Sequence, residues 1–89
     1  MPDRDPSGGA PEQLRVWVET VAKDLVDNAS AVEVAVVEED GVSVFELVVD
    51  PDELGRVIGR QGRTAQALRT LLGVAGARHG RSYDLEILE

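Results

Sequence analysis

The sequence predicts one small, two-layer α+β domain, and three observations lead to this fold class. The chain has 89 residues, enough for a single compact core but too few for two. β-Branched runs at 32–37 and 42–49 and an alternating apolar segment near the C-terminus predict three strands. Three other segments repeat apolar residues at helical spacing. The predicted order is helix, strand, strand, helix, helix, strand, with the three helices covering one face of a three-stranded sheet.

The first predicted helix extends from Glu12 to Asn28. Before it, residues 1–10 are polar, rich in proline and glycine and without apolar periodicity, which predicts a disordered leader ahead of a domain formed by residues 11–89. One apolar stripe marks the helix: Leu14, Val18, Val21 and Leu25. Trp17 lies beside this stripe, so we expect it to pack in the core or at an interface rather than to stack on a base.

The next two predicted strands form a hairpin. Residues 32–37 and 42–49 are separated by a turn ending in Asp40-Gly41, which is a strong hairpin signal. The acidic residues 38–40 resemble a metal site only superficially, because turn carboxylates are usually solvated and no other ligands converge on them. Apolar residues fall on both faces of the second strand, which indicates that part of the outer sheet face, or a helix surface, meets a partner.

Two helices joined by a tight loop follow the hairpin. Asp50-Pro51 is a helix-start signature, and Glu53 is placed to reach back as in a capping box. The short helix that begins there has three apolar residues: Leu54, Val57 and Ile58. Gly59 and Gly62 then interrupt the pattern. From Arg63 a second apolar stripe predicts a longer helix: Ala65, Leu68, Leu72 and Ala75.

A basic loop and a strand are predicted to complete the domain. Gly73 and Gly76 weaken and end the longer helix, and residues 76–81 form a glycine-flanked loop. His79 in this loop is the only imidazole of the chain, and an isolated surface histidine is expected to have no function. The last strand is predicted from three alternating apolar residues: Tyr83, Leu85 and Ile87.

Composition argues against enzymatic chemistry and against metal or cofactor binding. The chain has no cysteine, which excludes disulfides, thiolate zinc sites and a thiol nucleophile. No nucleophile lies beside a base, no pair of carboxylates marks a pocket, and no Walker-type phosphate loop is present. Neither a signal sequence nor an apolar run of about 18 residues occurs. We therefore expect a soluble cytoplasmic protein that is not an enzyme.

The charge is strongly uneven along the chain. The net charge is -8, which by itself opposes nucleic-acid binding. Residues 51–82, however, contain two acidic residues and six arginines, giving a local charge of +4. The arginines are Arg56, Arg60, Arg63, Arg69, Arg78 and Arg81. Arginine offers phosphate a forked hydrogen-bond donor that lysine lacks. For Arg69 and Arg78 we favour the simpler interpretation of solvated charges on a helix face.

The loop Gly59-Arg60-Gln61-Gly62 is the candidate functional site. Its two glycines let the backbone touch a ligand directly, and the helix that follows offers free N–H groups and a favourable dipole to phosphate. Arg60 and Gln61 are expected to face phosphate and sugar, with Arg56 and Arg63 as electrostatic support. The apolar residues Leu54, Val57 and Ile58 are predicted either to line a groove for bases or to lie in the core, and we expect core burial more for Ile58 than for Val57.

This loop, with the Asp-Pro-capped helix before it and the Ala/Leu-rich helix after it, resembles the type II KH signature, which clamps about four nucleotides of single-stranded backbone. The similarity covers residues 14–89. Residues 54–65 in particular resemble the small bacterial KhpA family of RNA-binding proteins. That resemblance implies a post-transcriptional regulator or RNA chaperone linked to cell elongation, division and shape. It also implies a homodimer and a heterodimer with a larger Jag-like (KhpB) RNA-binding protein.

Two functions therefore remain open. The first is a module that binds single-stranded RNA through the glycine loop. The second is a protein-interaction module, in which the acidic surface and apolar sheet or helix faces serve homodimerisation or binding to a Jag-like partner, and RNA contact by this chain is weak.

Overall fold

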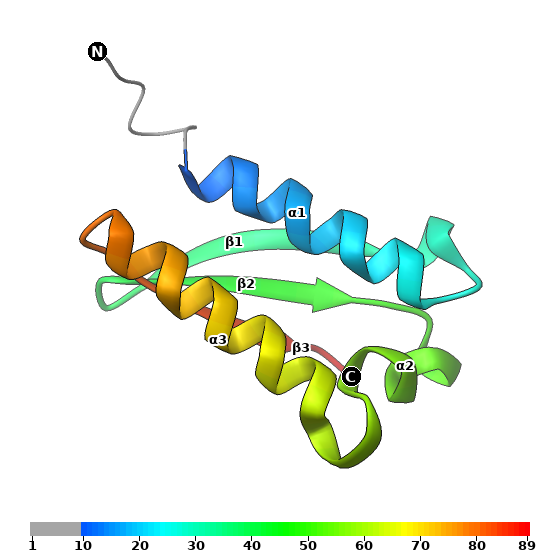
Figure 1. Cartoon of the computed structure of the whole chain (residues 1–89). Coiled ribbons are helices and arrows are strands. Elements are labelled where there is room, and N and C mark those ends of the chain that lie inside the picture. Colours follow the sequence, from blue (N-terminus) through cyan, green and yellow to red (C-terminus); the bar gives the residue numbers. More distant parts are fainter. Residues whose placement is uncertain (1–9) are drawn as a thin grey trace.

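The computed structural model describes residues 10–89 and contains the six expected elements in the expected order (Figure 1). They are α1 (Ala10–Leu25), β1 (Glu33–Glu39), β2 (Val42–Val48), α2 (Leu54–Ile58), α3 (Arg63–Arg78) and β3 (Ser82–Ile87). Short 3-10 turns at Ala29–Ala31, Pro51–Glu53 and Arg60–Gly62 join some of them. The α+β class is confirmed. Apart from Ala10, which begins α1, the predicted leader lies outside the described residues.

The three strands form one mixed sheet in the order β1-β2-β3. β1 and β2 are antiparallel, and Val37 lies opposite Val44 near the turn. Asp40 and Gly41 both have positive φ, 52° and 82°, which is the backbone of the tight turn that an Asp-Gly pair favours. β2 and β3 run parallel, because α2 and α3 form the crossover between them. All three α-helices lie on one side of the sheet (Figure 1).

The first helix ends earlier than predicted, at Leu25 rather than Asn28. The carboxylate of Glu53 accepts hydrogen bonds from the backbone N–H groups of Asp27 (2.6 Å) and Asn28 (2.9 Å). A continuing helix would need these N–H groups for its own carbonyls, so a residue from the start of α2 ends α1. Glu53 therefore does not complete the predicted capping box, whereas Asp50 does cap by accepting from the N–H of Asp52 at 3.0 Å.

The core lies between the sheet and the helices. Its members come from all six elements and include Val18, Ala22, Val34, Phe45, Leu47, Val57, Leu68, Leu72, Tyr83 and Leu85. The rings of Phe45 and Tyr83 meet edge to face, with centroids 5.5 Å apart. Trp17 packs against this cluster and is half-buried, which confirms the prediction of a packing role.

The end of α3 differs from the prediction in one respect. Gly76 does not end the helix but lies buried within it, and α3 continues to Arg78. A Cβ at Gly76 would lie 2.8 Å from the carbonyl oxygen of Arg81 and 3.1 Å from the ring of Tyr83. The glycine thus allows α3 to approach β3 closely, and Ala75, predicted in the apolar stripe, is only half-buried.

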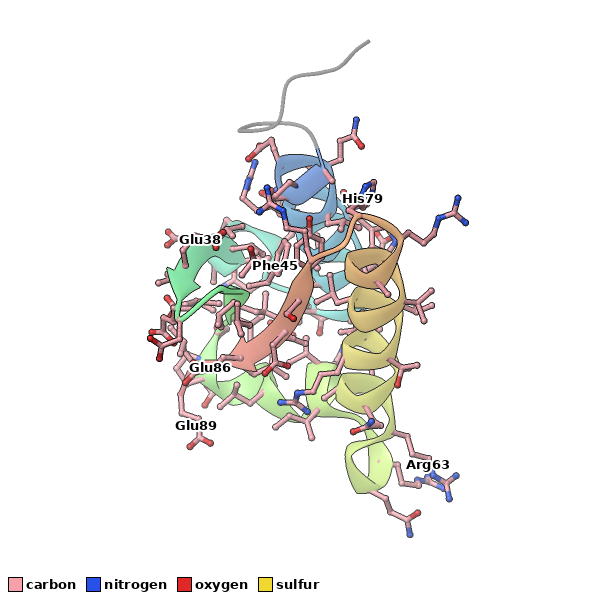
Figure 2. All side chains as sticks on the ribbon, turned by 90° about the vertical axis from the view of Figure 1, so that its left-hand side faces the viewer. Glu38, Phe45, Arg63, His79, Glu86 and Glu89 are labelled. Atoms are coloured by element: carbon pink, nitrogen blue, oxygen red, sulfur yellow. The ribbon has the colours of Figure 1, made fainter. Side chains whose placement is uncertain are left out.

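The outer face of the sheet carries carboxylates among apolar residues, which include Val44 and Val48 of β2, as predicted for this strand. The strand registers place five carboxylates on it: Glu33, Glu39, Glu46, Asp84 and Glu86. Figure 2 shows Glu86 and Glu89 on the sheet side of the molecule, with Arg63 at the opposite lower corner. No helix among residues 10–89 is long and apolar enough to cross a membrane.

Candidate nucleic-acid interface

The Gly59-Arg60-Gln61-Gly62 loop is a tight connection between α2 and α3. Gly59 ends α2 with φ 80° and ψ 170°, and its N–H donates to Gly55 at 2.9 Å. A Cβ at Gly59 would overlap the side chain of Thr64 and lie 2.8 Å from the Thr64 backbone nitrogen. Only glycine fits this position, because both its backbone angles and its contact with Thr64 exclude a side chain.

The other half of the loop is open to solvent. Gln61 and Gly62 both have positive φ, 57° and 74°, and a Cβ at Gly62 would have no neighbour within 4 Å. The N–H of Gly62 donates to the carbonyl of Gly59 at 3.0 Å, which closes the turn. A ligand can therefore approach the backbone at Gly62 without meeting another part of the protein.

α3 begins directly at this loop, and no side chain caps it. Gly62 is its N-cap residue. The N–H of Arg63, the first residue of α3, donates to the carbonyl of Arg60, so the donors that suit a phosphate oxygen are the N–H groups that follow it in the first turn. Arg60, Gln61 and Arg63 are exposed, and within residues 10–89 neither arginine forms an ion pair. Figure 2 shows the Arg63 side chain directed away from the body of the molecule. Positive charge and a helix N-terminus without a side-chain cap thus coincide at one corner.

Arg56 is held differently from the other two arginines. Its Nη2 lies 3.2 Å from Oδ2 of Asp27 and its Nη1 lies 3.4 Å from Oδ1 of the same residue. The guanidinium is therefore paired with a carboxylate from the segment after α1.

The structure reverses our expectation for two apolar residues beside the loop. Val57 is completely buried, whereas Ile58 and Leu54 are half-buried. α2 has only five residues, and its packing turns Val57 toward the sheet and leaves part of Ile58 accessible. Of the predicted contact residues, Val57 thus supports the loop from inside the core, and Ile58 retains surface for a base.

A comparison with protein families identifies the family of this chain. A family model described as KhpA/KhpB, KH domain, matches residues 15–87. The chain belongs to this KH-domain family. The resemblance seen in residues 54–65 and the type II KH arrangement of elements are thereby confirmed.

Several curated relatives are similar over most of their length. The chain is 54% identical over 76 residues to "RNA-binding protein KhpA" of Aquifex aeolicus, covering 85% of this chain and 96% of the relative. It is 49% identical over 72 residues to the protein of that name in Streptomyces coelicolor, covering 81% and 90%. For the Borreliella burgdorferi protein the identity is 42% over 72 residues, covering 81% and 88%.

Two other arginines of this KH domain were predicted to be solvated charges on a helix. Arg78 is exposed, in agreement with that interpretation. Arg69 is also exposed, but its Nε donates a hydrogen bond to the carbonyl of Leu85 at 3.2 Å. The N–H of Leu85 donates to Oδ1 of Asp84 at 2.8 Å. At Leu85, then, both backbone groups are satisfied by side chains.

The remaining sequence candidates lie away from the loop. His79 and Arg81 are exposed at the other end of α3, which a helix of 16 residues places about 24 Å from the glycine loop. Glu38 accepts a hydrogen bond of 2.6 Å from the hydroxyl of Ser43. Within residues 10–89 no group of three acidic or histidine side chains is placed to hold a metal.

Sequence reasoning missed two residues that shape the site, Thr64 and Asp27. Thr64 follows the glycine motif directly, and its contact with Gly59 is visible only once the turn is built. Asp27 reaches the site from a position 29 residues before Arg56. No local pattern signals such a long-range pair.

Proposed function

We propose that this KH domain binds single-stranded RNA, with the nucleic-acid backbone held at the Gly59–Gly62 loop. The observation that carries the proposal is the coincidence, at one corner, of an open backbone turn, an uncapped helix N-terminus and two exposed arginines without an acidic partner in residues 10–89. The relatives are named RNA-binding protein KhpA, which supports the same ligand.

In this proposal each part of the site has a distinct role. A phosphate lies against the exposed backbone at Gly62 and accepts hydrogen bonds from N–H groups that follow Arg63 in the first turn of α3. Arg60 and Arg63 add forked, charge-assisted hydrogen bonds to neighbouring phosphates, and the Gln61 amide bonds to sugar or phosphate oxygens. The accessible part of Ile58 offers an apolar surface against which a base can lie.

The charge distribution favours RNA binding at the loop corner rather than at the sheet. The outer sheet face carries carboxylates, which repel phosphate, whereas Arg60 and Arg63 at the loop corner have no acidic partner within residues 10–89. Because binding at this corner depends on charge, it is expected to weaken as salt increases, with a modest slope because phosphate contacts are few.

Fluorescence anisotropy of an end-labelled, single-stranded RNA of mixed sequence tests this proposal at two salt concentrations. The test variant carries Arg60→Asp and Gln61→Asp. A matched control carries Arg81→Asp and Gln13→Asp, the same change in charge at exposed positions remote from the loop. Thermal melts establish that all three proteins fold.

The expected result is salt-sensitive binding that the loop substitutions abolish and the control substitutions reduce far less. Equal losses in both variants would mean that overall charge, and not the loop, governs binding. A wild-type protein that binds no RNA would leave the interaction module as the better explanation.

A second candidate function, self-association, rests on an apolar patch on α3. Leu71 and Val74 are 52% and 57% exposed, and their spacing of three residues places them on one helix face. Residues this apolar and this exposed favour a protein partner. We propose that the patch forms a homodimer interface or receives a Jag-like (KhpB) partner, and that dimerisation raises RNA affinity by joining two sites.

Size-exclusion chromatography with light scattering tests the patch. The wild type is expected to have the mass of a dimer, and Leu71→Ser with Val74→Ser the mass of a monomer. A wild type that stays monomeric at every concentration and captures no KhpB protein would exclude this function.

On the basis of the family resemblance, we also propose a role in the cell. The proposed role is post-transcriptional control or RNA chaperone activity in the cytoplasm, with an influence on cell elongation, division and shape. Deletion of the gene followed by complementation with the wild type or with the Arg60→Asp, Gln61→Asp variant tests whether any change in cell shape depends on the loop.

A further inference from the structure

The carboxylate of Asp27 forms an ion pair with Arg56. Its two carboxylate oxygens face two nitrogens of the guanidinium, at 3.2 and 3.4 Å. This is the forked arrangement that a guanidinium offers a phosphate group. Arg56 lies three residues before Gly59, within one helical turn of the loop. A released Arg56 is therefore close enough to serve RNA bound there.

The position of Asp27 does not depend on Arg56. Its backbone N–H and that of Asn28 donate to the Glu53 carboxylate, at 2.6 and 2.9 Å. The side-chain amide of Asn28 also donates to Asp50, at 3.2 Å. These bonds fasten the segment after α1 to the start of α2. They keep the Asp27 backbone beside α2 whether or not Arg56 is paired with its side chain.

The Arg56–Asp27 ion pair is exposed enough for Arg56 to exchange Asp27 for a phosphate. The side chain of Arg56 is 53% exposed and that of Asp27 is 82% exposed, so water and salt weaken their attraction and a phosphate can reach the guanidinium. Arg60 and Arg63 have no such partner within residues 10–89. Arg60 and Arg63 are thus available to phosphate directly, whereas Arg56 must first leave Asp27.

We infer that Asp27 is an affinity-setting residue, which competes with RNA phosphate for Arg56 and so lowers the affinity of the loop for RNA. The inference rests on the proposed RNA-binding function and deepens it. In the free protein Arg56 is paired with Asp27. When RNA binds, the guanidinium exchanges the carboxylate for a phosphate oxygen, and Asp27 becomes solvated.

The test is a set of anisotropy titrations with the same labelled single-stranded RNA. Asp27→Asn removes the competing charge but keeps the backbone bonds to Glu53, so the fold is preserved, and a thermal melt checks this. Asp24→Asn is the matched control, because Asp24 is exposed, lies three residues away and forms no ion pair within residues 10–89. Both substitutions remove one negative charge.

Asp27→Asn is expected to tighten binding about two- to fivefold more than Asp24→Asn, the range that corresponds to one exposed ion pair. In an Arg56→Gln background the two substitutions are expected to have equal effects. This double-mutant comparison separates the competition for Arg56 from a general change in charge.

Two results would overturn the inference while leaving the proposed function intact. One is equal tightening by Asp27→Asn and Asp24→Asn in the wild-type background. The other is an advantage of Asp27→Asn that persists when Arg56 is glutamine. If the Arg60→Asp, Gln61→Asp variant binds RNA as well as the wild type does, the proposed loop site is wrong. If the wild type binds no RNA, both the proposed function and the inference about Asp27 are wrong.

Discussion

Replacing Gly59 by alanine is expected to destabilise the domain much more than the same replacement at Gly62. Both glycines belong to the loop and both have positive φ. They differ in their surroundings, because a Cβ at Gly59 would overlap Thr64, whereas a Cβ at Gly62 would have no neighbour within 4 Å. Comparing the two substitutions therefore separates the cost of the contact with Thr64 from the cost of the positive φ.

The structure sets the size of the difference. At Gly62 only the left-handed backbone opposes alanine, at a cost of about 1–2 kcal/mol. At Gly59 the φ and ψ angles belong to a region that is almost restricted to glycine, costing about 1–3 kcal/mol. The overlap with Thr64 adds about 1–3 kcal/mol. The expected loss of about 2–6 kcal/mol is a large part of the stability of an 89-residue domain, about 4–13 kcal/mol.

Urea denaturation followed by fluorescence measures these losses. Trp17 is the only tryptophan and is half-buried against the core, so its emission reports unfolding. The free energy of unfolding is obtained by linear extrapolation for the wild type, Gly59→Ala and Gly62→Ala. Equal losses in the two variants would refute the reasoning, because they would show that the contact with Thr64 does not constrain the loop.

Three further predictions concern stability. Gly76→Ala is expected to destabilise the domain by about 1–3 kcal/mol through overpacking against β3. Gly73→Ala, at an exposed helical position with no neighbour within 4 Å, is expected to stabilise it by about 0.5–1 kcal/mol. Urea denaturation measures both changes, and a Gly76→Ala variant more stable than Gly73→Ala would contradict the structure. Hydrogen bonds from a backbone N–H and then from an amide side chain lower the pKa of Asp50. Its contribution to stability is therefore present above the unfolded-state pKa of about 3.9 and is lost as pH falls through the lower folded-state value. In thermal melts across this acidic range, the wild type should accordingly lose more stability than Asp50→Asn. An equal loss in both proteins as pH falls would count against a stabilising role for the ionised Asp50. Glu46 lies beside Glu86 on the outer sheet face, so Glu46→Gln is expected to raise stability by about 0.2–1 kcal/mol at low salt and by less at high salt; a gain independent of salt would argue against charge repulsion.

Local sequence signals were sufficient for the elements and for the loop. Apolar periodicity identified the helices, the Asp40-Gly41 pair marked the hairpin, and Asp50 signalled the start of the α2 region. The two glycines around Arg60-Gln61, with helices on both sides, identified the candidate site. Each of these signals depends on residues close together in the sequence, which is why the sequence alone contains them.

Tertiary structure decided the features that depend on distant residues. Glu53 ends α1 from 26 residues away, and the approach of α3 to β3 explains the buried Gly76. In a helix as short as α2, periodicity does not determine which side faces the core, so the burial of Val57 rather than Ile58 required the packed structure. Likewise, Arg56 has an acidic partner because folding brings Asp27 beside it, whereas Arg60 has none within residues 10–89. Sequence therefore determined the local conformations and the presence of the loop, whereas the packing of separate segments decided which side chains are free to bind, because contacts between distant residues form only when the whole core closes.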